Sequence, residues 1–244
     1  MSRNFELLQQ LGEQEGVFSG LYVASPAPHG ETEERNGNSA GDERVRGEIQ
    51  RLVQTLFLSG EGAPHRVLFC GVDEREASGR LCTAAARMLA NEVALPVCVV
   101  DGKLHAPSLQ QFFHSDGFFS SHGNGSNRLH ARQVDHNLWF IALQNVLLMS
   151  DSACGAEQLR SSLGEIGKAF AYVLIDAEPV GRQSDAVALA QATDGVVLVL
   201  EANSTRRVAA LSAKETLETA GARLLGTVLN DRTFPVPETL YRRL

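Results

Sequence analysis

Short apolar runs alternate with segments of helical periodicity along most of the chain. The apolar runs are the right length for buried strands, and they occupy residues 66–70, 97–100, 138–143, 171–175, 195–200 and 224–229. Between them, helical spacing of apolar residues predicts helices at 44–58, 79–91, 155–169, 184–192 and 205–220, and one that begins at Pro107. Wholly apolar strands that alternate with helices are typical of a parallel sheet covered on both faces. We therefore expect an α/β fold with a doubly wound, mostly parallel sheet and helices on both faces.

The N-terminal part of the chain and one internal stretch lack these patterns. Residues 1–23 carry a weak apolar rhythm that would suit a short docking helix, and residues 24–44 are rich in Pro, Gly, Ser, Asn and charged residues. So little apolar surface cannot offset the entropy lost on ordering, which predicts a flexible linker. Residues 115–135 are rich in Gly, Ser, Asn and His and predict a loop. We expect an N-terminal segment and linker over 1–44 and one folded domain over 45–244.

The composition argues against several classes of partner and site. The formal net charge is −7, whereas a nucleic-acid-binding protein needs a basic surface, so we expect no nucleic acid partner. The four cysteines form no CxxC pair, which argues against a zinc site and favours free thiols in a reducing compartment. No segment resembles a signal peptide, and no apolar run approaches the roughly 18–20 residues that cross a membrane. We therefore expect a cytoplasmic protein that reaches the inner membrane only through a partner, without direct insertion.

Ligands of such sheets bind where the strands end, and the residues found there carry a family pattern. The segments are AYVLIDAEP at 171–179, DGVVLVLEANSTRR at 194–207, ETAGARLLGTVLNDR at 218–232, VCVVDGKLHAPSL at 97–109 and TFPVPETLYRRL at 233–244. Together they resemble the bacterial tyrosine autokinases of capsular and exopolysaccharide synthesis, a family of the P-loop NTPase superfamily. Glu178 stands where that family usually has Pro. The resemblance covers roughly the predicted domain and implies a P-loop NTPase-like fold.

The phosphate-binding loop of that family is degenerate in this chain. Its general form, G-x-x-x-x-G-K-[ST], supplies backbone N–H groups and a Lys for the phosphates and a hydroxyl for Mg²⁺. The corresponding stretch, residues 71–81, contains no lysine. Counting forward from the strand aligns residues 77–79 with Gly-Lys-Ser/Thr and puts Ser78 at the Lys position. We prefer this register because it keeps the spacing to the next helix. Counting back aligns residues 79–81 instead, with a positive charge at Arg80 but no hydroxyl for a metal.

Charges in the same loop oppose a triphosphate. Asp73, Glu74 and Glu76 place carboxylates where the phosphates would lie, and Arg75 offsets only part of their charge. Like charges this close repel by several kcal/mol at an effective dielectric constant of about 20. If a nucleotide nevertheless binds, the candidate contacts are Ser78, Gly79, Arg80, Asn230 and Arg232. The last two match a family segment near the base, although an Asn after a strand is equally an ordinary turn former.

The metal side of the site is altered as well. In the family, an acidic pair after the second strand helps to hold Mg²⁺ and to orient the attacking hydroxyl. Asp101 matches the first acid, but Lys103 replaces the second, and its ammonium would repel Mg²⁺. We interpret Lys103 as a solvated surface residue, with direct binding of an anion as the alternative. Asp176 matches the other metal-side aspartate. In an active enzyme Asp101 and Asp176 would be catalytic and Asp176 would hold Mg²⁺; alternatively, both carboxylates cap neighbouring backbone N–H groups.

Further features bear on self-association and modification. The family's E-x-x-R-x-x-R pattern, which builds ring-like oligomers, survives here as Glu48-x-x-Arg51, with Gln54 in place of the last Arg. Residues at this spacing share a helical face, so we expect either a weakened homo-oligomer or an ordinary solvated face. The family phosphorylates a cluster of C-terminal tyrosines, whereas this chain has one there, Tyr241, followed by two arginines. Tyr241 is a candidate phosphosite, although packing of a terminal helix is the favoured interpretation.

The resemblance and the degenerate loop together predict a non-catalytic relative of the tyrosine autokinases. Such a pseudokinase would regulate or scaffold exopolysaccharide or capsule biosynthesis and export. It would dock on a membrane polysaccharide co-polymerase or on an active tyrosine kinase, and no cofactor is then expected. One alternative is an active ATP-dependent protein-tyrosine autokinase with an atypical phosphate loop, which would need ATP and Mg²⁺. Another is a partitioning or positioning ATPase, since that class shares the fold.

Overall fold

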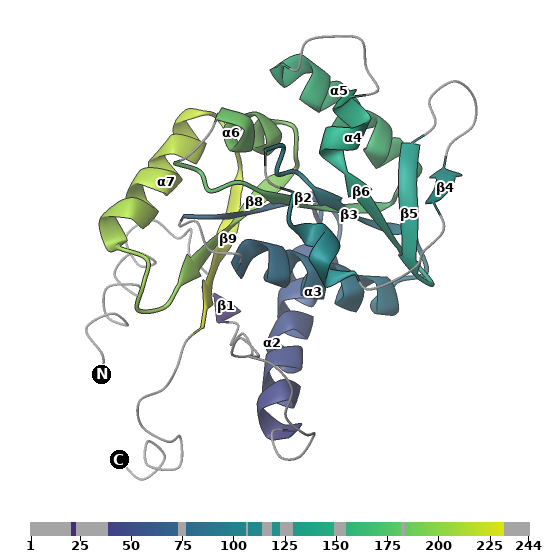
Figure 1. Ribbon diagram of the computed structural model, residues 1–244. Helices are drawn as coiled ribbons and strands as arrows, with labels where there is room; N and C mark the ends of the chain where they lie inside the picture. Colours follow the sequence, from purple (N-terminus) through teal and green to yellow (C-terminus); the bar gives the residue numbers. More distant parts are fainter. Residues whose placement is uncertain are drawn as a thin grey trace.

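The computed structural model describes residues 21–22, 39–72, 77–105, 107–113, 119–122, 129–148, 155–181 and 184–231. Within these ranges nine strands form one sheet, in the spatial order β1-β9-β8-β2-β7-β3-β6-β5-β4 (Figure 1). The strands are β1 (Leu21–Tyr22), β2 (Arg66–Gly71), β3 (Val97–Asp101), β4 (Phe119–His122), β5 (Leu129–Asp135), β6 (Leu138–Ala142), β7 (Tyr172–Ala177), β8 (Gly195–Glu201) and β9 (Leu224–Asn230). Neighbours from β1 across to β6 are parallel, and β5 and β4 continue the sheet in antiparallel pairing.

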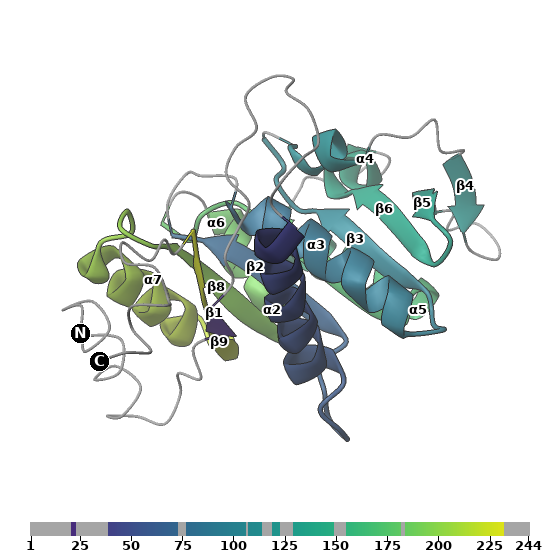
Figure 2. The same ribbon diagram turned by 90° about the horizontal axis from the view of Figure 1, so that it is seen from below.

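Helices cover both faces of this sheet. They are α2 (Ser39–Phe57), α3 (Ala77–Glu92), the short 3-10 helix η1 (Leu109–Phe112), α4 (Leu143–Leu148), α5 (Ala156–Ala169), α6 (Ser184–Gln191) and α7 (Arg207–Thr219). Helices α2 and α3 lie side by side on one face, and α4 to α7 cover the other (Figure 2). The predicted α/β fold with a mostly parallel, doubly covered sheet is confirmed.

Alternate residues of the central strand β2 supply two buried cores. Val67 and Phe69 belong to the core beneath α2 and α3, while Leu68 and Cys70 belong to the core on the opposite face. All four side chains are fully buried. Because both faces are covered, the strand is a continuous apolar run instead of an alternating one, which is why its sequence predicted a buried strand.

The first long helix begins earlier than predicted. Helix α2 begins at Ser39, inside the stretch of residues 24–44 that was expected to be a flexible linker. Its apolar residues Leu52, Val53 and Phe57 are buried against the sheet and α3, so packing of the later turns extends order into a polar first turn. Leu21–Tyr22 forms a short strand along β9 instead of a helix. The other residues of the predicted linker lie outside the described ranges.

The predicted loop at residues 115–135 is wrong, because it contains β4 and β5. These strands form an antiparallel hairpin on the edge of β6, so cross-strand hydrogen bonding compensates for a polar sequence of low strand propensity. Ala131 is fully buried, and the guanidinium of Arg132 lies over the ring of Phe140 at 5.4 Å from its centroid. Such tertiary contacts are invisible to a local pattern.

The helix expected to begin at Pro107 is only the single 3-10 turn η1. Its first N–H groups are bonded by a carboxylate from β3, and the N–H of Phe113 donates to the carbonyl of Gln110, which closes a turn of three residues. Helix α4 begins at Leu143, a residue that the sequence had assigned to the preceding strand.

A carboxylate ties the start of β2 to the chain entering β8. Asp194 accepts hydrogen bonds from the backbone N–H groups of His65 (2.9 Å) and Arg66 (2.8 Å). It also accepts from the Arg66 guanidinium, at 3.1 Å from Nε and 2.7 Å from Nη2. Partial burial alone would raise the pKa of Asp194, but these hydrogen bonds and the charge of Arg66 lower it below its ordinary value. The ion pair therefore helps to fix the register between β2 and β8.

Free thiols lie deep in the structure. Cys70 on β2, Cys82 on α3 and Cys98 on β3 are all free and fully buried, which confirms the prediction for the described cysteines. Burial, reinforced by the charge of Asp176, raises the pKa of Cys70 to about 12. Cys154 lies outside the described ranges. Of the helices in the described part of the chain, none is both long enough and apolar enough to cross a membrane.

Candidate functional site

The carboxyl ends of β3 and β7 form the centre of the candidate site. The two strands are parallel neighbours, and Asp101 is the register partner of Asp176. Immediately after β3, the N–H of Gly102 donates to the backbone oxygen of Asp176 at 2.8 Å. A Cβ at position 102 would lie 2.8 Å from that oxygen, so only glycine lets the chain turn this close to β7. The chain that leaves β3 thus begins in direct contact with the backbone of Asp176.

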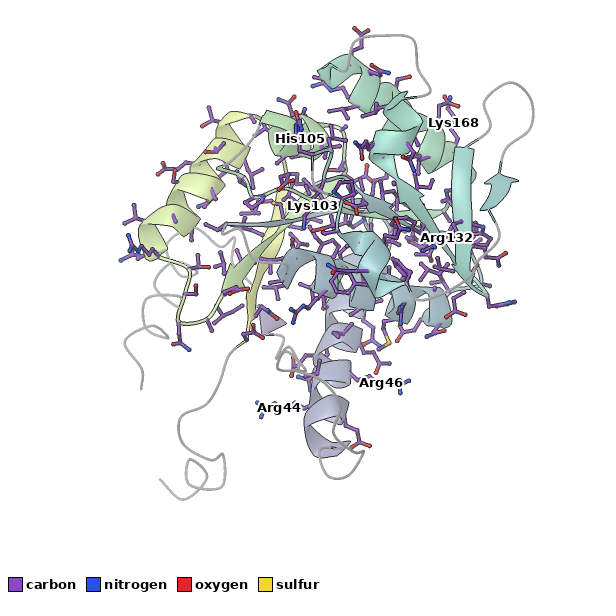
Figure 3. All side chains as sticks on the ribbon, in the orientation of Figure 1. Arg44, Arg46, Lys103, His105, Arg132 and Lys168 are labelled. Carbon is purple, nitrogen blue, oxygen red and sulfur yellow. The ribbon has the colours of Figure 1, made fainter. Side chains whose placement is uncertain are left out.

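Lys103 is buried and paired, which corrects both interpretations made from the sequence. Its side chain is neither solvated nor available to an external anion, since the residue is only 7% exposed. Nζ lies 2.9 Å from Oδ2 of the fully buried Asp176 and donates to Oγ of Ser108 at 3.2 Å. Figure 3 shows Lys103 toward the middle of the molecule. The tight turn at Gly102 directs the lysine inward, and an ion pair compensates for its burial.

The electrostatics of the pair keep both groups charged near neutral pH. Burial raises the pKa of Asp176 to about 6, although the Lys103 ammonium and the Ser78 hydroxyl oppose this rise. Burial alone would lower the pKa of Lys103, but the carboxylates of Asp176, Asp101 and Glu178 raise it above its ordinary value. For Lys103, the effect of the neighbouring carboxylates on the pKa is larger than the effect of burial. For Asp176, the neighbouring ammonium offsets only part of the rise in pKa that burial causes.

Asp101 serves the backbone, as the capping interpretation predicted. Its carboxylate accepts hydrogen bonds from the N–H groups of Lys103 (3.2 Å), Ser108 (2.8 Å) and Leu109 (2.8 Å). Burial raises the pKa of Asp101 above its ordinary value, while these hydrogen bonds oppose the rise. The capping interpretation does not hold for Asp176, because in the described ranges its carboxylate accepts no backbone N–H group and lies against the Lys103 ammonium. The two aspartates are adjacent but have different partners.

The start of α3 brings two of the predicted loop residues against Asp176. Ser78 is 2% exposed, with its hydroxyl toward that carboxylate. A Cβ on Gly79 would lie 3.0 Å from Oδ2 of Asp176, so position 79 faces the metal-side acid. This geometry favours the first register, in which position 79 corresponds to the family's metal-binding Ser/Thr. Arg80 is exposed on the helix and takes no part in the cluster.

The other residues predicted for the site lie away from Asp176 or outside the described ranges. Asn230 ends β9 at the same edge of the sheet, 4% exposed, with β8 and β2 between it and β7. Glu48 and Arg51 form an ion pair at 3.5 Å on α2, on a face where the Arg51 side chain is 73% exposed. Tyr241, Arg232 and the residues 73–76 lie outside the described ranges, so the expected repulsion in the phosphate loop stays a prediction.

Sequence reasoning missed the remaining partners of Lys103. Ser108 accepts from its ammonium, and Glu178 is 7% exposed and close enough to raise its pKa. The departure from the family's Pro at position 178 was the available signal for Glu178. For Ser108, only the turn that reverses the chain after β3 could have revealed the contact.

Magnesium does not fit the described residues of this site. Mg²⁺ requires close octahedral oxygen ligands at about 2.0–2.1 Å. Here Oδ2 of Asp176 is paired with an ammonium, which leaves only Oδ1 without a partner among the described residues; the Asp101 oxygens accept backbone N–H groups, and Gly79 has no hydroxyl. No group of three or more His, Cys, Asp or Glu side chains in the described ranges is arranged to hold a metal. The carboxylate of Asp176 is therefore arranged to pair with a cation of the chain itself, the Lys103 ammonium.

Comparison with known proteins agrees with this fold. No protein-family model matches the chain. A stretch of 61 residues, 25% of the chain, is 43% identical to the tyrosine-protein kinase CpsD of Streptococcus agalactiae. The kinase domain of the Escherichia coli tyrosine kinase ETK superposes with a TM-score of 0.68 at 16% identity, over 92% of this chain and 95% of that domain. Over the stretch that matches CpsD, the chain is a relative of the bacterial tyrosine kinases.

The sequence match covers only a small part of each protein. The match to the CpsD kinase spans only 27% of the length of that protein, and the likeness to the ETK domain shows the fold alone. A plasmid partition protein from Borrelia burgdorferi shares the same fold, with a TM-score of 0.50 at 14% identity over 74% of this chain and 86% of that one. The predicted relationship to the tyrosine kinases and the P-loop NTPase-like fold are thus confirmed.

Proposed function

We propose that this relative of the bacterial tyrosine kinases is non-catalytic. It regulates or scaffolds exopolysaccharide or capsule biosynthesis and export from the cytoplasmic side of the membrane. It docks there on a membrane polysaccharide co-polymerase or on an active tyrosine kinase. The sequence resemblance and the relationship to the CpsD kinase support the pathway class.

The burial of Ser78 is the observation that carries the non-catalytic assignment. In the favoured register this residue stands where the family has the lysine that reaches the β- and γ-phosphates. A serine has no charge for the phosphates, and this one is 2% exposed and directed at Asp176. Residues 71–81 contain no lysine, so no neighbouring position supplies the missing ammonium.

An active kinase would need the other register, which the geometry supports less well. Arg80 would then supply the charge, but it is exposed on α3, whereas Asp176 is fully buried. Leu81 would stand at the metal-binding position, where it is 4% exposed and has no ligand atom to offer. Register and chemistry therefore both favour a site without phosphoryl transfer.

Calorimetric titration with Mg·ATP tests this assignment directly. We expect no heat of binding up to millimolar nucleotide, with an active bacterial tyrosine kinase that has an intact loop as the positive control. Micromolar binding would refute the non-catalytic assignment in its strong form. Transfer of radiolabelled phosphate to Tyr241, abolished by Tyr241→Phe, would identify an active kinase instead; binding and hydrolysis without transfer would point to a partitioning-type ATPase.

Co-purification tests the proposed partners. The full chain should be retained by a co-polymerase or an active tyrosine kinase encoded beside it, in membranes from cells that produce the polysaccharide. Neighbouring genes for glycosyltransferases and a chain-length regulator would support the pathway. Retention by neither partner, together with unchanged polysaccharide after deletion of the gene, would argue against a scaffold.

A further inference from the structure

Lys103 places a positive charge against Asp176, the residue that the resemblance to the tyrosine autokinases implies for the metal side. We infer that its ammonium is a built-in replacement for the divalent cation beside Asp176. Nζ lies 2.9 Å from Oδ2 of that aspartate, which is itself fully buried. The surrounding carboxylates of Asp101 and Glu178 are 1% and 7% exposed. A cluster of this kind needs a cation, because uncompensated buried carboxylates cost several kcal/mol each.

Like a bound metal ion, the ammonium contacts oxygen atoms from two separate segments of the chain. It joins the end of β7, through Asp176, to the turn that precedes η1, through Ser108. Both contacts are made by Lys103, which lies between β3 and η1, so they hold the start of that connection against the sheet. A lysine has three donors that can serve several oxygens at once. The cation is thus supplied by the chain and needs no uptake from solution.

Gly79, at the position of the family's metal-binding Ser/Thr in the favoured register, likewise offers no ligand for a metal. At Gly79, a side chain would approach the same Oδ2 that the ammonium contacts, with its Cβ at 3.0 Å. It would also meet Cδ2 of Leu109 at 3.0 Å. The position that could offer a metal-binding hydroxyl therefore has no side chain, and the carboxylate oxygen it would share is already paired.

Paramagnetic Mn²⁺ and thermal unfolding test this replacement. The full wild-type chain should have the same Tm in EDTA and in millimolar Mg²⁺, and Mn²⁺ should not broaden NMR signals around Asp176. Lys103→Ala should have a lower Tm in EDTA and regain part of it in Mg²⁺, because the vacated space lies between carboxylates. Lys168→Ala is the matched control, since it removes a lysine whose side chain is 75% exposed in a surface ion pair. It should behave as the wild type.

Two results would overturn the replacement. One is selective broadening around Asp176 by Mn²⁺ in the wild-type chain, which would mean that a metal still binds there. The other is a Lys103→Ala variant as stable as the wild type in EDTA. If that variant does not fold, the wild-type Mn²⁺ measurement still decides. The two proposals can fail separately. Nucleotide binding without a metal at Asp176 would refute the proposed function but not the replacement of the metal by Lys103.

Discussion

Asp101 and Asp176 are register partners at the ends of two adjacent parallel strands, yet their carboxylates have entirely different partners. Asp101 accepts three backbone N–H groups from the following loop, whereas Asp176 faces the ammonium of Lys103. Because Lys103 lies on the loop that Asp101 holds, the first aspartate positions the counter-ion of the second. The two acids and the lysine therefore act as one unit, and changes at any of them should be coupled.

The pKa of Asp176 predicts that part of the stability is lost as the pH rises. Its folded value of about 6 exceeds the reference value of 3.8, so the folded state keeps a proton that the unfolded state has released. The free energy of unfolding should therefore fall between about pH 4 and pH 6, by about 2–3 kcal/mol from this group. Urea unfolding across this range should show a steeper decline in the wild type than in Asp176→Asn, where Asp101 still contributes. An equal slope in both proteins would contradict the assignment.

Asp194 predicts the opposite dependence on pH. Its pKa lies below the ordinary value in the folded state, so its contribution is complete above the unfolded value and is lost as the pH falls through the folded one. Asp194→Ala should lower the free energy of unfolding by about 1–3 kcal/mol near neutral pH, because it leaves the N–H groups of His65 and Arg66 without an acceptor. The loss should shrink in acid. A deficit that is independent of pH would count against an ionic role.

Gly102→Ala should destabilise the loop after β3. The new Cβ would lie 2.8 Å from the backbone oxygen of Asp176, so the loop would have to move away from β7. We expect a loss of about 2–3 kcal/mol in urea unfolding, since overpacking against fixed backbone has costs of this size. Gly164→Ala is the control, because a Cβ there meets no atom within 4 Å on α5. That variant should gain about 0.5–1 kcal/mol from helix propensity.

Arg51→Ala separates stability from self-association. Its ion pair with Glu48 is long and exposed, so the free energy of unfolding should change by less than about 0.5 kcal/mol. If the helical face acts as it does in the resembling family, sedimentation velocity should show less self-association than for the wild type. A wild-type chain that is monomeric at every concentration would instead mark this face as ordinary solvated surface.

The parts of the fold that could be predicted are those with a strong local pattern. Runs such as residues 195–200 are buried on both faces, and their composition alone indicates a strand. The hairpin of β4 and β5 could not be found this way, because its order comes from pairing with β6 and from contacts such as Arg132 over Phe140. Tertiary pairing there overrides local propensity.

The candidate site was predicted as a set of positions, but not as a set of contacts. Strand ends identified Asp101 and Asp176, because parallel strands bring their carboxyl ends to one edge. The burial of Lys103 was missed, since charged residues after strands are usually solvated. Its partner lies far along the sequence, and nothing local reveals that the turn at Gly102 directs the lysine inward.

The buried cysteines make the chain a reporter of its own opening. Cys70, Cys82 and Cys98 are inaccessible in the native state, and the Cys70 thiol, with a pKa of about 12, is protonated there. A thiol reagent can therefore react with them only after the central strands separate from the helices that cover them. The labelling rates of these three thiols would then measure how often the sheet opens.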